Sequence, residues 1–509
     1  MTRQEIIRDL GEGLVLRRAS AADAEALAAF NADLHRDEGT AQPDEGIAVW
    51  TRDLLLRPHP TMSAGGVTVV EDRRSGAIVS SLSLIPQTWA YAGREFGVGR
   101  MELVGTNSGY RQRGLVRAQF AVAHAWSAAR GQAAQIVTGI PYFYRQFGYE
   151  MVLTLGAGRA GSKLDVPALK EGETEPYMVR PAPAADAPFI ARTYAAGQRR
   201  HLVRDVRSAA VWRYEIEGYS EGSIVRVETR ILETPGGEPV GFLAHLPRLE
   251  RGRVVLVSYE LAGKVSWATV TPTVLRYVYA VGEDYARRQG GEIGGHFSWR
   301  GTDHPCYRVA ERCLPVVRRP YAHYVRVADL PGFLRLIGPV LEDRLLAAGL
   351  AGHDGGLKLG FFRSGCRLVF AGGRLVVSEP WLPGPGNYGD ATFPDLTFLQ
   401  LLFGYRDLSE LEYAFPDCGA RADTSHALLM ALFPKQASDV WALIRAPRRF
   451  STLPAASASA GPDRRGRPGA VLRRGWCATP RSRRATCRGC LRQRGTCPRV
   501  DRWSGRWRQ

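Results

Sequence analysis

The sequence lacks any run of about 18 uncharged apolar residues, so no membrane-spanning helix is expected. It also lacks an apolar core near its start, because Met1 to Glu5 lead into mixed polar sequence. This argues against a signal peptide and makes the cytoplasm the expected location. The ten histidines include no HxxxH or HExxH pair, and no metal site is expected.

Acidic residues are scarce only at one end of the chain. The formal net charge is +18, but residues 446–509 contain 17 Arg, no Lys and two acidic residues, which gives 17 − 2 = +15. The preceding 445 residues therefore carry only 18 − 15 = +3. An argument from basic charge about nucleic-acid partners applies to this tail alone.

The tail is also poor in aliphatic residues and rich in Pro, Ser, Ala and Arg, a composition that predicts disorder over 446–509. Its central Cys487–Cys490 pair lacks the second, regularly spaced pair that zinc sites usually have. Nucleic-acid binding through the tail and an extended or misread gene end both remain open. The four cysteines before residue 446 are scattered and form no secreted disulfide framework.

The length of 509 residues predicts about three domains. Residues 1–162 alternate helix and strand signals, and residues 163–178 have the Lys, Glu, Gly and Pro content of a linker. Residues 179–187 (VRPAPAADA) then echo residues 16–24 (LRRASAADA), with a shift of 186 − 23 = 163 residues. We therefore expect a second, degenerate copy of the first domain over 179–340, although short Ala-rich echoes also arise by chance.

Residues 345–445 have a different character. Two apolar strands flank Ala371-Gly372-Gly373, which is a hairpin signal, and 396–403 and 427–432 have the apolar content of helices. We expect a smaller α/β domain here. The fold class expected for the whole chain is α+β, with tandem mixed sheets, this smaller domain and the tail.

The strongest functional signal is the segment 106–117 (TNSGYRQRGLVR), between a predicted strand at 101–104 and a predicted helix at 115–129. A glycine at a helix start lets a ligand approach unpaired backbone N–H groups, where the helix dipole favours an anion. Arg111, Arg113 and Arg117 add positive charge, which suits a pyrophosphate. The alternative is a solvated basic helix start with a structural glycine.

Arg111 to Val116 resembles the coenzyme A pyrophosphate loop of the GNAT acetyltransferase superfamily, [Q/R]-x-x-G-x-[G/A]. Val116 replaces the small last residue, as in the enhanced intracellular survival (Eis) family. Residues 144–149 (YRQFGY) are similar to the element that closes a GNAT domain. The predicted order of domains resembles the Eis-like order: an active GNAT domain, a GNAT-like domain without a cofactor loop, and a sterol-carrier-like domain.

This resemblance implies transfer of an acetyl group from acetyl-CoA to a primary amine, of an aminoglycoside-like molecule or a protein lysine, by a hexamer. It implies Tyr144 as the general acid, with core packing as the alternative role. Glu102 is a weak candidate for the base, and a salt-bridged glutamate is the alternative. The expected cofactor-binding residues are Val104, Gly105, Thr106, Arg111, Gln112, Arg113, Gly114, Leu115, Val116 and Arg117.

One departure concerns the C-terminus. Eis-like enzymes are thought to use their C-terminal carboxylate as a base, whereas here the residues resembling the family's end, 433–444, are followed by 65 more. Two rival functions remain open. One is a non-catalytic lipid or small-molecule carrier that uses the C-terminal domain, and the other is nucleic-acid binding through the tail.

Overall fold

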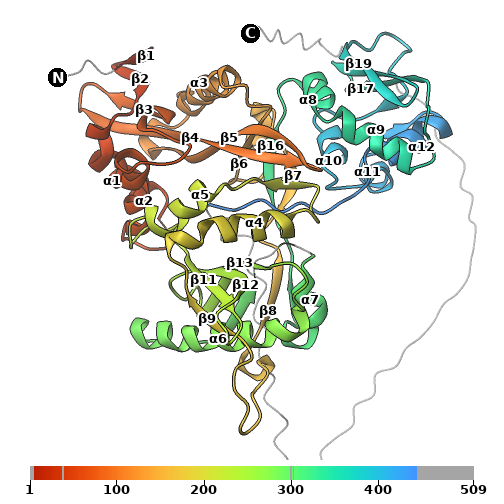
Figure 1. Cartoon of the computed structure of the whole chain (residues 1–509). Coiled ribbons are helices and arrows are strands. Elements are labelled where there is room, and N and C mark those ends of the chain that lie inside the picture. Colours follow the sequence, from red (N-terminus) through yellow and green to blue (C-terminus); the bar gives the residue numbers. More distant parts are fainter. Residues whose placement is uncertain (1–4, 37–38, 299–300, 302, 444–509) are drawn as a thin grey trace, which may run out of the picture. The chain divides into compact units, whose positions relative to one another are not determined.

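Three β-sheets organise the residues that the computed structural model describes, which are 5–36, 39–298, 301 and 303–443 (Figure 1). Helices pack on these sheets, which confirms the predicted α+β class. None of the helices in these ranges is long and apolar enough to cross a membrane. The predictions made for 446–509 lie outside the described residues.

The first sheet is formed mainly by the N-terminal part of the chain. Its strands, in spatial order, are β1 (Ile6–Gly11), β2 (Leu14–Arg18), β3 (Val67–Asp72), β4 (Ala77–Tyr91), β5 (Arg94–Thr106), β6 (Ala134–Val137), β16 (Tyr321–Arg326) and β7 (Glu150–Leu155), and β10 (Val203–Asp205) pairs with β4. All neighbours are antiparallel except β5 and β6.

Alternation along β4 places helices on both faces of this sheet. Leu82 and Leu84 pack beneath α3 (Leu115–Ala129), whereas Ile85 faces α1 (Ala24–Leu34) and α2 (Glu45–Leu56). The bounds of α3 agree with the helix predicted at 115–129. A capping box is present on the short helix η1 (Ala21–Asp23), which precedes α1.

The second sheet has the same plan. Its strands, in spatial order, are β9 (Met178–Pro181), β11 (Glu228–Glu233), β12 (Pro239–His245), β13 (Arg253–Leu261), β14 (Gly295–Ser298), β8 (Gly158–Gly161) and β15 (Val316–Arg318). Only β13 and β14 are parallel. The helices are α4 (Ala187–Gln198), α5 (Ala209–Arg213), α6 (Trp267–Gln289) and α7 (Pro305–Val309), with α4 and α6 on opposite faces.

The echo at a shift of 163 residues corresponds to repeated ion pairs. In each half, an arginine on one strand binds an aspartate six residues later in the chain and a glutamate on the neighbouring strand of the sheet. The pairs are Arg17–Asp23 (2.7 Å) and Arg17–Glu71 (2.6 Å) in the first half, and Arg180–Asp186 (2.6 Å) and Arg180–Glu233 (2.7 Å) in the second. Identical local chemistry at equivalent positions supports a duplicated unit.

The two halves exchange one strand each. β16 comes from within the predicted range 179–340, yet it lies between β6 and β7 of the first sheet. β8 comes from within the predicted range 1–162, yet it lies between β14 and β15 of the second sheet. Each sheet therefore obtains an internal strand from the other half of the chain.

The third sheet carries the predicted hairpin. Its strands, in spatial order, are β19 (Arg374–Trp381), β18 (Gly365–Ala371), β17 (Gly355–Gly360), β20 (Ala391–Thr392) and β21 (Gly419–Ala420). Its helices are α8 (Leu330–Leu336), α9 (Gly338–Ala347), α10 (Phe398–Leu402), α11 (Leu408–Ala414) and α12 (Asp423–Leu432). Both turn glycines, Gly372 and Gly373, have positive φ angles.

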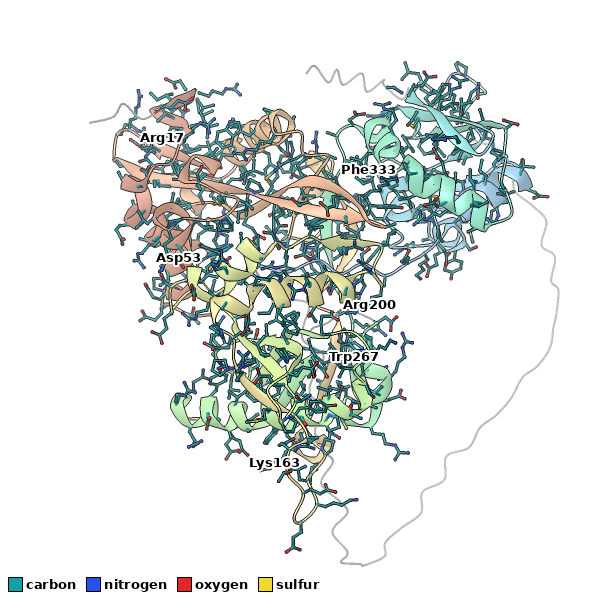
Figure 2. All side chains as sticks on the ribbon, viewed as in Figure 1. Arg17, Asp53, Lys163, Arg200, Trp267 and Phe333 are labelled. Atoms are coloured by element: carbon teal, nitrogen blue, oxygen red, sulfur yellow. The ribbon has the colours of Figure 1, made fainter. Side chains whose placement is uncertain are left out.

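The apolar interior of this third part is filled by side chains and is continuous with the far end of the β4–β5 hairpin. Phe333 of α8, labelled in Figure 2, packs edge-on against Phe96 with ring centroids 5.3 Å apart. The hydroxyl of Tyr91 donates a hydrogen bond to Leu402 O at 2.7 Å.

Candidate active site

A bulge in β5 opens the centre of the first sheet. Ser81 of β4 pairs with Gly105 and Ser83 pairs with Glu102, so Leu103 and Val104 together oppose one residue, Leu82. Leu103 has a φ of +52°, the backbone strain that such a bulge concentrates. The consequence is a local change in the direction of β5.

β5 also runs past its parallel neighbour. The last pair between β5 and β6 is Met101 with Val137, where β6 ends, whereas β5 continues to Thr106. In the part of the chain that the structure describes, residues 102–106 therefore have no strand beside them on the β6 side. Backbone groups at such an edge can pair with an extended ligand.

The helix α3 begins next to the end of this open edge. Gly114, its N-cap residue, has a φ of +74°, and no side chain caps the first turn. A Cβ atom at Gly114 would meet nothing within 4 Å, so backbone conformation rather than crowding calls for glycine there. The first backbone N–H groups of α3 thus face an uncrowded approach.

Three arginines surround this helix start. Arg111, Arg113 and Arg117 are exposed, and among the described residues none of them is held in a buried ion pair. Arg113 bonds the exposed Glu12 at 3.1 Å, and Arg117 bonds Gln146 Oε1 at 2.9 Å. Their charge, the helix dipole and the free backbone donors make this an anion-binding geometry.

Most of the remaining predicted cofactor residues have side chains that are buried or half-buried, so only their backbone groups can meet a ligand. The side chain of Leu115 is buried in the core, and Thr106 Oγ1 lies 2.8 Å from Ser80 Oγ in a buried hydroxyl cluster. A Cβ atom at Gly105 would overlap Leu34 of α1. These residues, with the half-buried Val104 and Val116, offer their backbone rather than their side chains. Gln112 is exposed, with a φ of +64°.

Tyr144 lies in the short helix η4 (Phe143–Phe147), which follows the end of β6. Its ring is buried among Phe120, Phe143 and Tyr324, with centroids 5.2 to 5.9 Å away. Burial, followed by the negative charge of Glu102, raises the pKa of its hydroxyl above the ordinary value. Within the described ranges no hydrogen-bond partner is present on this hydroxyl.

Glu102 is buried in an ion pair. Its Oε1 accepts a hydrogen bond from Arg100 Nε at 2.6 Å, and both side chains are fully enclosed. Arg100 also donates to the carbonyl of Trp441 at 2.7 Å. Burial raises the pKa of the Glu102 carboxyl, and Arg100 opposes part of that rise. Glu102 is therefore a salt-bridged glutamate, the alternative given above. A raised pKa of its carboxyl is also the direction of change that a general base requires.

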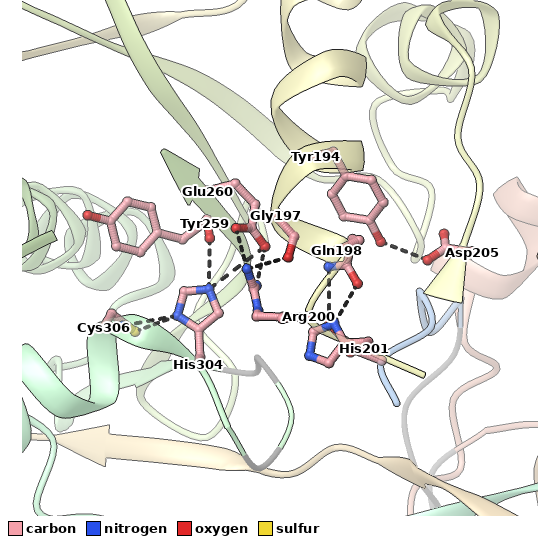
Figure 3. A network of polar contacts seen from close by, with 11 residues as sticks. Tyr194, Gly197, Gln198, Arg200, His201, Asp205, Tyr259, Glu260, His304 and Cys306 are labelled. Atoms are coloured by element: carbon pink, nitrogen blue, oxygen red, sulfur yellow. Dashed lines mark hydrogen bonds and ion pairs between the residues drawn. The ribbon is translucent and has the colours of Figure 1, made fainter. Parts of the chain in front are cut away.

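Among the described residues of the second half, the equivalent position on β13 is covered by side chains. Leu256 and Ser298 form the last pair of β13 with β14, and Tyr259 lies three residues farther, as Val104 does beyond Met101. His304 Nε2 donates a hydrogen bond to the carbonyl of Tyr259 at 3.0 Å (Figure 3). The rings of Trp267 and His304 are in contact, 5.0 Å apart.

The same closed region contains a charged pair. Figure 3 shows Arg200 beside Glu260. The shorter nitrogen–oxygen distance of this pair is 2.5 Å. The thiol of Cys306 lies 2.9 Å from His304 Nδ1. In place of the glycine of α3, α6 begins after Ser266. Protein side chains thus occupy the position that is open in the first half.

Several residues at the first site were not identified from the sequence. Tyr324 and Tyr321 belong to the exchanged strand β16, and Trp441 belongs to a C-terminal segment that passes Arg100. No local pattern points to them, because they reach the site only through tertiary pairing. Arg100 had a usable signal, since it shares a strand face with Glu102 two residues away.

Comparison with known families and structures gives a consistent assignment. Residues 17–152 match the acetyltransferase (GNAT) domain family. A search of curated proteins found no match. The residues that match this family include the open edge, the helix start and Tyr144.

Solved structures show the same fold over most of the chain. A probable N-acyltransferase of Enterococcus faecalis is similar with a TM-score of 0.58 and 15% identity, over 84% of this chain and 99% of that one. A GCN5-related N-acetyltransferase from Kribbella flavida gives 0.56 and 16%, over 84% and 99%. Eis1 from Mycobacterium abscessus gives 0.53 and 13%, over 85% and 100%. The domain match over residues 17–152 supports acyl transfer, and these structures show a shared fold alone.

Proposed function

We propose that the protein is an acetyl-CoA-dependent N-acetyltransferase that acts on a primary amine. The observation that carries the proposal is the meeting of three features at one edge of the first sheet. These are the open backbone of β5 after Met101, the helix start at Gly114 and the buried Tyr144. A phosphorylated, extended thioester needs an anion site, a strand-like partner and an acid near its sulfur.

The residues fit coenzyme A along its length. The pyrophosphate would accept hydrogen bonds from the first N–H groups of α3, with Arg111, Arg113 and Arg117 around it. The amide-containing arm would pair with the backbone of Val104 and Thr106, as an added strand does. No side chain of β5 has to move for that pairing, because its hydroxyl and apolar groups face inward.

Acetyl transfer forms a bond between the amine nitrogen and the acetyl carbon and breaks the bond between that carbon and sulfur. Tyr144 donates its hydroxyl proton to the departing sulfur. Its raised pKa keeps the phenol protonated at neutral pH. Glu102 accepts the proton that the nitrogen loses, directly or through water, while Arg100 holds the carboxylate in place. The products are the acetylated amine and the free thiol.

The second half, in this proposal, is a structural copy without its own acetyl-CoA site. His304 already uses the backbone carbonyl of Tyr259, and Trp267 begins the helix where the first half has an open start. A single site for each chain follows. Titration calorimetry with acetyl-CoA should therefore give a stoichiometry close to one.

The experiment that tests the function is an acetyl-transfer assay on the full chain with aminoglycosides and lysine peptides as acceptors. Released thiol and acetylated product are measured together. Tyr144→Phe should lower kcat by about 100-fold, within the range typical of general acids, while acetyl-CoA affinity changes little. Tyr149→Phe is the matched control, because Tyr149 is a buried tyrosine of the same cluster whose hydroxyl bonds His124 at 2.8 Å.

One result would reject the proposed activity, and another would reject only the acid role of Tyr144. One is the failure of the full chain to bind acetyl-CoA saturably, which would remove the cofactor site. The other is unchanged turnover in the Tyr144→Phe variant, which would remove the acid role while leaving the fold and cofactor loop intact.

A further inference from the structure

The loop that leads into η4 is held by tyrosines from the other half of the chain. This loop, residues 138–142, connects β6 to η4. The hydroxyl of Tyr324 accepts a hydrogen bond from Tyr142 N at 2.5 Å and lies 3.3 Å from Ile140 O, to which it donates. The hydroxyl of Tyr321 donates to Gly139 O at 2.8 Å. Both tyrosines belong to the exchanged strand β16.

The backbone of this loop touches the hydroxyl of Tyr144. A Cβ atom built on Gly139 would lie 2.9 Å from Tyr144 Oη, so the loop and the hydroxyl are in contact. Gly139 and Tyr142 both have positive φ angles, +142° and +59°. A residue other than glycine holds such a conformation only when its surroundings impose it. For Tyr142 the hydrogen bond to Tyr324 is part of that constraint.

Tyr324 also contacts the ring of Tyr144 directly. The two rings are arranged edge to face, with centroids 5.5 Å apart. Tyr324 is fully buried, and its hydroxyl is engaged by loop backbone on two sides. It therefore has no free access to a reacting group. Its contacts instead fix both the ring of Tyr144 and the backbone against the Tyr144 hydroxyl.

We propose that Tyr324 is a positioning residue for acyl transfer, and that it holds the hydroxyl of Tyr144 at the open edge of β5 by fixing loop 138–142. The inference rests on the proposed function, in which Tyr144 is the acid. It also gives the strand exchange a role in activity, since the second half supplies part of the first half's site.

A double-mutant cycle on the full chain tests this inference. Tyr324→Phe keeps the ring and removes the hydroxyl with both of its hydrogen bonds to the loop, so kcat should fall about tenfold. In the Tyr144→Phe background the same change should cost less than about twofold, because there is no acid left to position. KM for acetyl-CoA should stay within about twofold in every variant.

A purely structural role for Tyr324 would give a different result. The loss on removing its hydroxyl would then be equal with and without Tyr144, and an additive cycle would overturn the proposal. Unchanged kcat in Tyr324→Phe would also overturn it. If Tyr144→Phe alone leaves turnover unchanged, the acid assignment itself fails, which is a separate and distinguishable outcome.

A second variant covers the case in which Tyr324→Phe does not fold. Tyr321→Phe removes the bond to Gly139 O from a less buried position. We expect a several-fold loss of kcat that also disappears in the Tyr144→Phe background. Tyr149→Phe should show no coupling of this kind with Tyr321→Phe, and equal coupling would contradict the proposed route through the loop.

Discussion

A negative charge introduced at Gly114 should weaken acetyl-CoA binding selectively. Gly114 has a φ of +74°, so any other residue costs about 1 kcal/mol of stability, and a new side chain would extend into open space. Gly114→Gln and Gly114→Glu share that cost and have the same size. Their difference therefore isolates the charge at the helix start.

The size of that difference follows from Coulomb's law. A carboxylate about 6 Å from a pyrophosphate with about two charges is repelled by about 1.4 kcal/mol even at the dielectric constant of water. That corresponds to about a tenfold increase in Kd for Gly114→Glu relative to Gly114→Gln, and more where solvent is excluded. The ratio should shrink in about 1 M salt, which reduces the screening length to about 3 Å.

Isothermal titration of acetyl-CoA into each full-length variant measures the ratio, and thermal melting checks that both variants fold equally well. Equal Kd values for the two variants would show that no anion binds at the start of α3. Gly109→Glu adds the same charge to the exposed loop five residues earlier and should have a much smaller effect.

Three further predictions concern buried groups. Glu102→Gln should remove the acid limb of the kcat/KM profile. The native pKa of the Glu102 carboxyl is raised, so the protein loses stability as pH rises from the unfolded-state pKa of this group to its native pKa. Glu102→Gln should remove that loss. An unchanged pH profile of kcat/KM would exclude Glu102 as the base. Arg17→Met leaves two carboxylates unpaired against the core and should lower the free energy of unfolding in urea by about 3–5 kcal/mol. Arg180→Met affects a pair whose arginine is about one-third exposed and should cost about 1 kcal/mol or less. Equal costs would contradict the argument that burial makes the first pair more important. Gly105→Val should destabilise the protein by about 1–3 kcal/mol by overpacking against α1, and a neutral result would show that the helix shifts freely.

Local features of the fold were predictable from the sequence because local chemistry determines them. The capping box at Ser20 and Asp23, the helix after Gly114 and the hairpin at Gly372-Gly373 all follow from short-range patterns. The loop before α3, for which we propose anion binding, belongs to the same class. Its glycine, its arginines and the following helix are contiguous in sequence.

Features that depend on distant pairing were not predictable in the same way. β4 extends to Tyr91, and its far end is covered by Phe333 and the third part of the chain. Glu102 turned out to be paired with Arg100 in the core, a partner set by strand alternation and burial rather than by motif. In the proposed site the β5 residues 104–106 would contribute backbone instead of side chains, which depends on the bulge at Leu103.

The strand exchange has a consequence for synthesis of the chain. Val137 pairs with Tyr324, which is 324 − 137 = 187 residues later, so the first sheet lacks an internal strand until that segment leaves the ribosome. At about 5–20 residues per second, this delay is about 10–40 s. During that interval β6 and β7 present unpaired backbone and apolar side chains. Chaperone demand and sensitivity to translation rate should therefore be concentrated in this step, and a fragment ending near residue 162 should aggregate rather than fold.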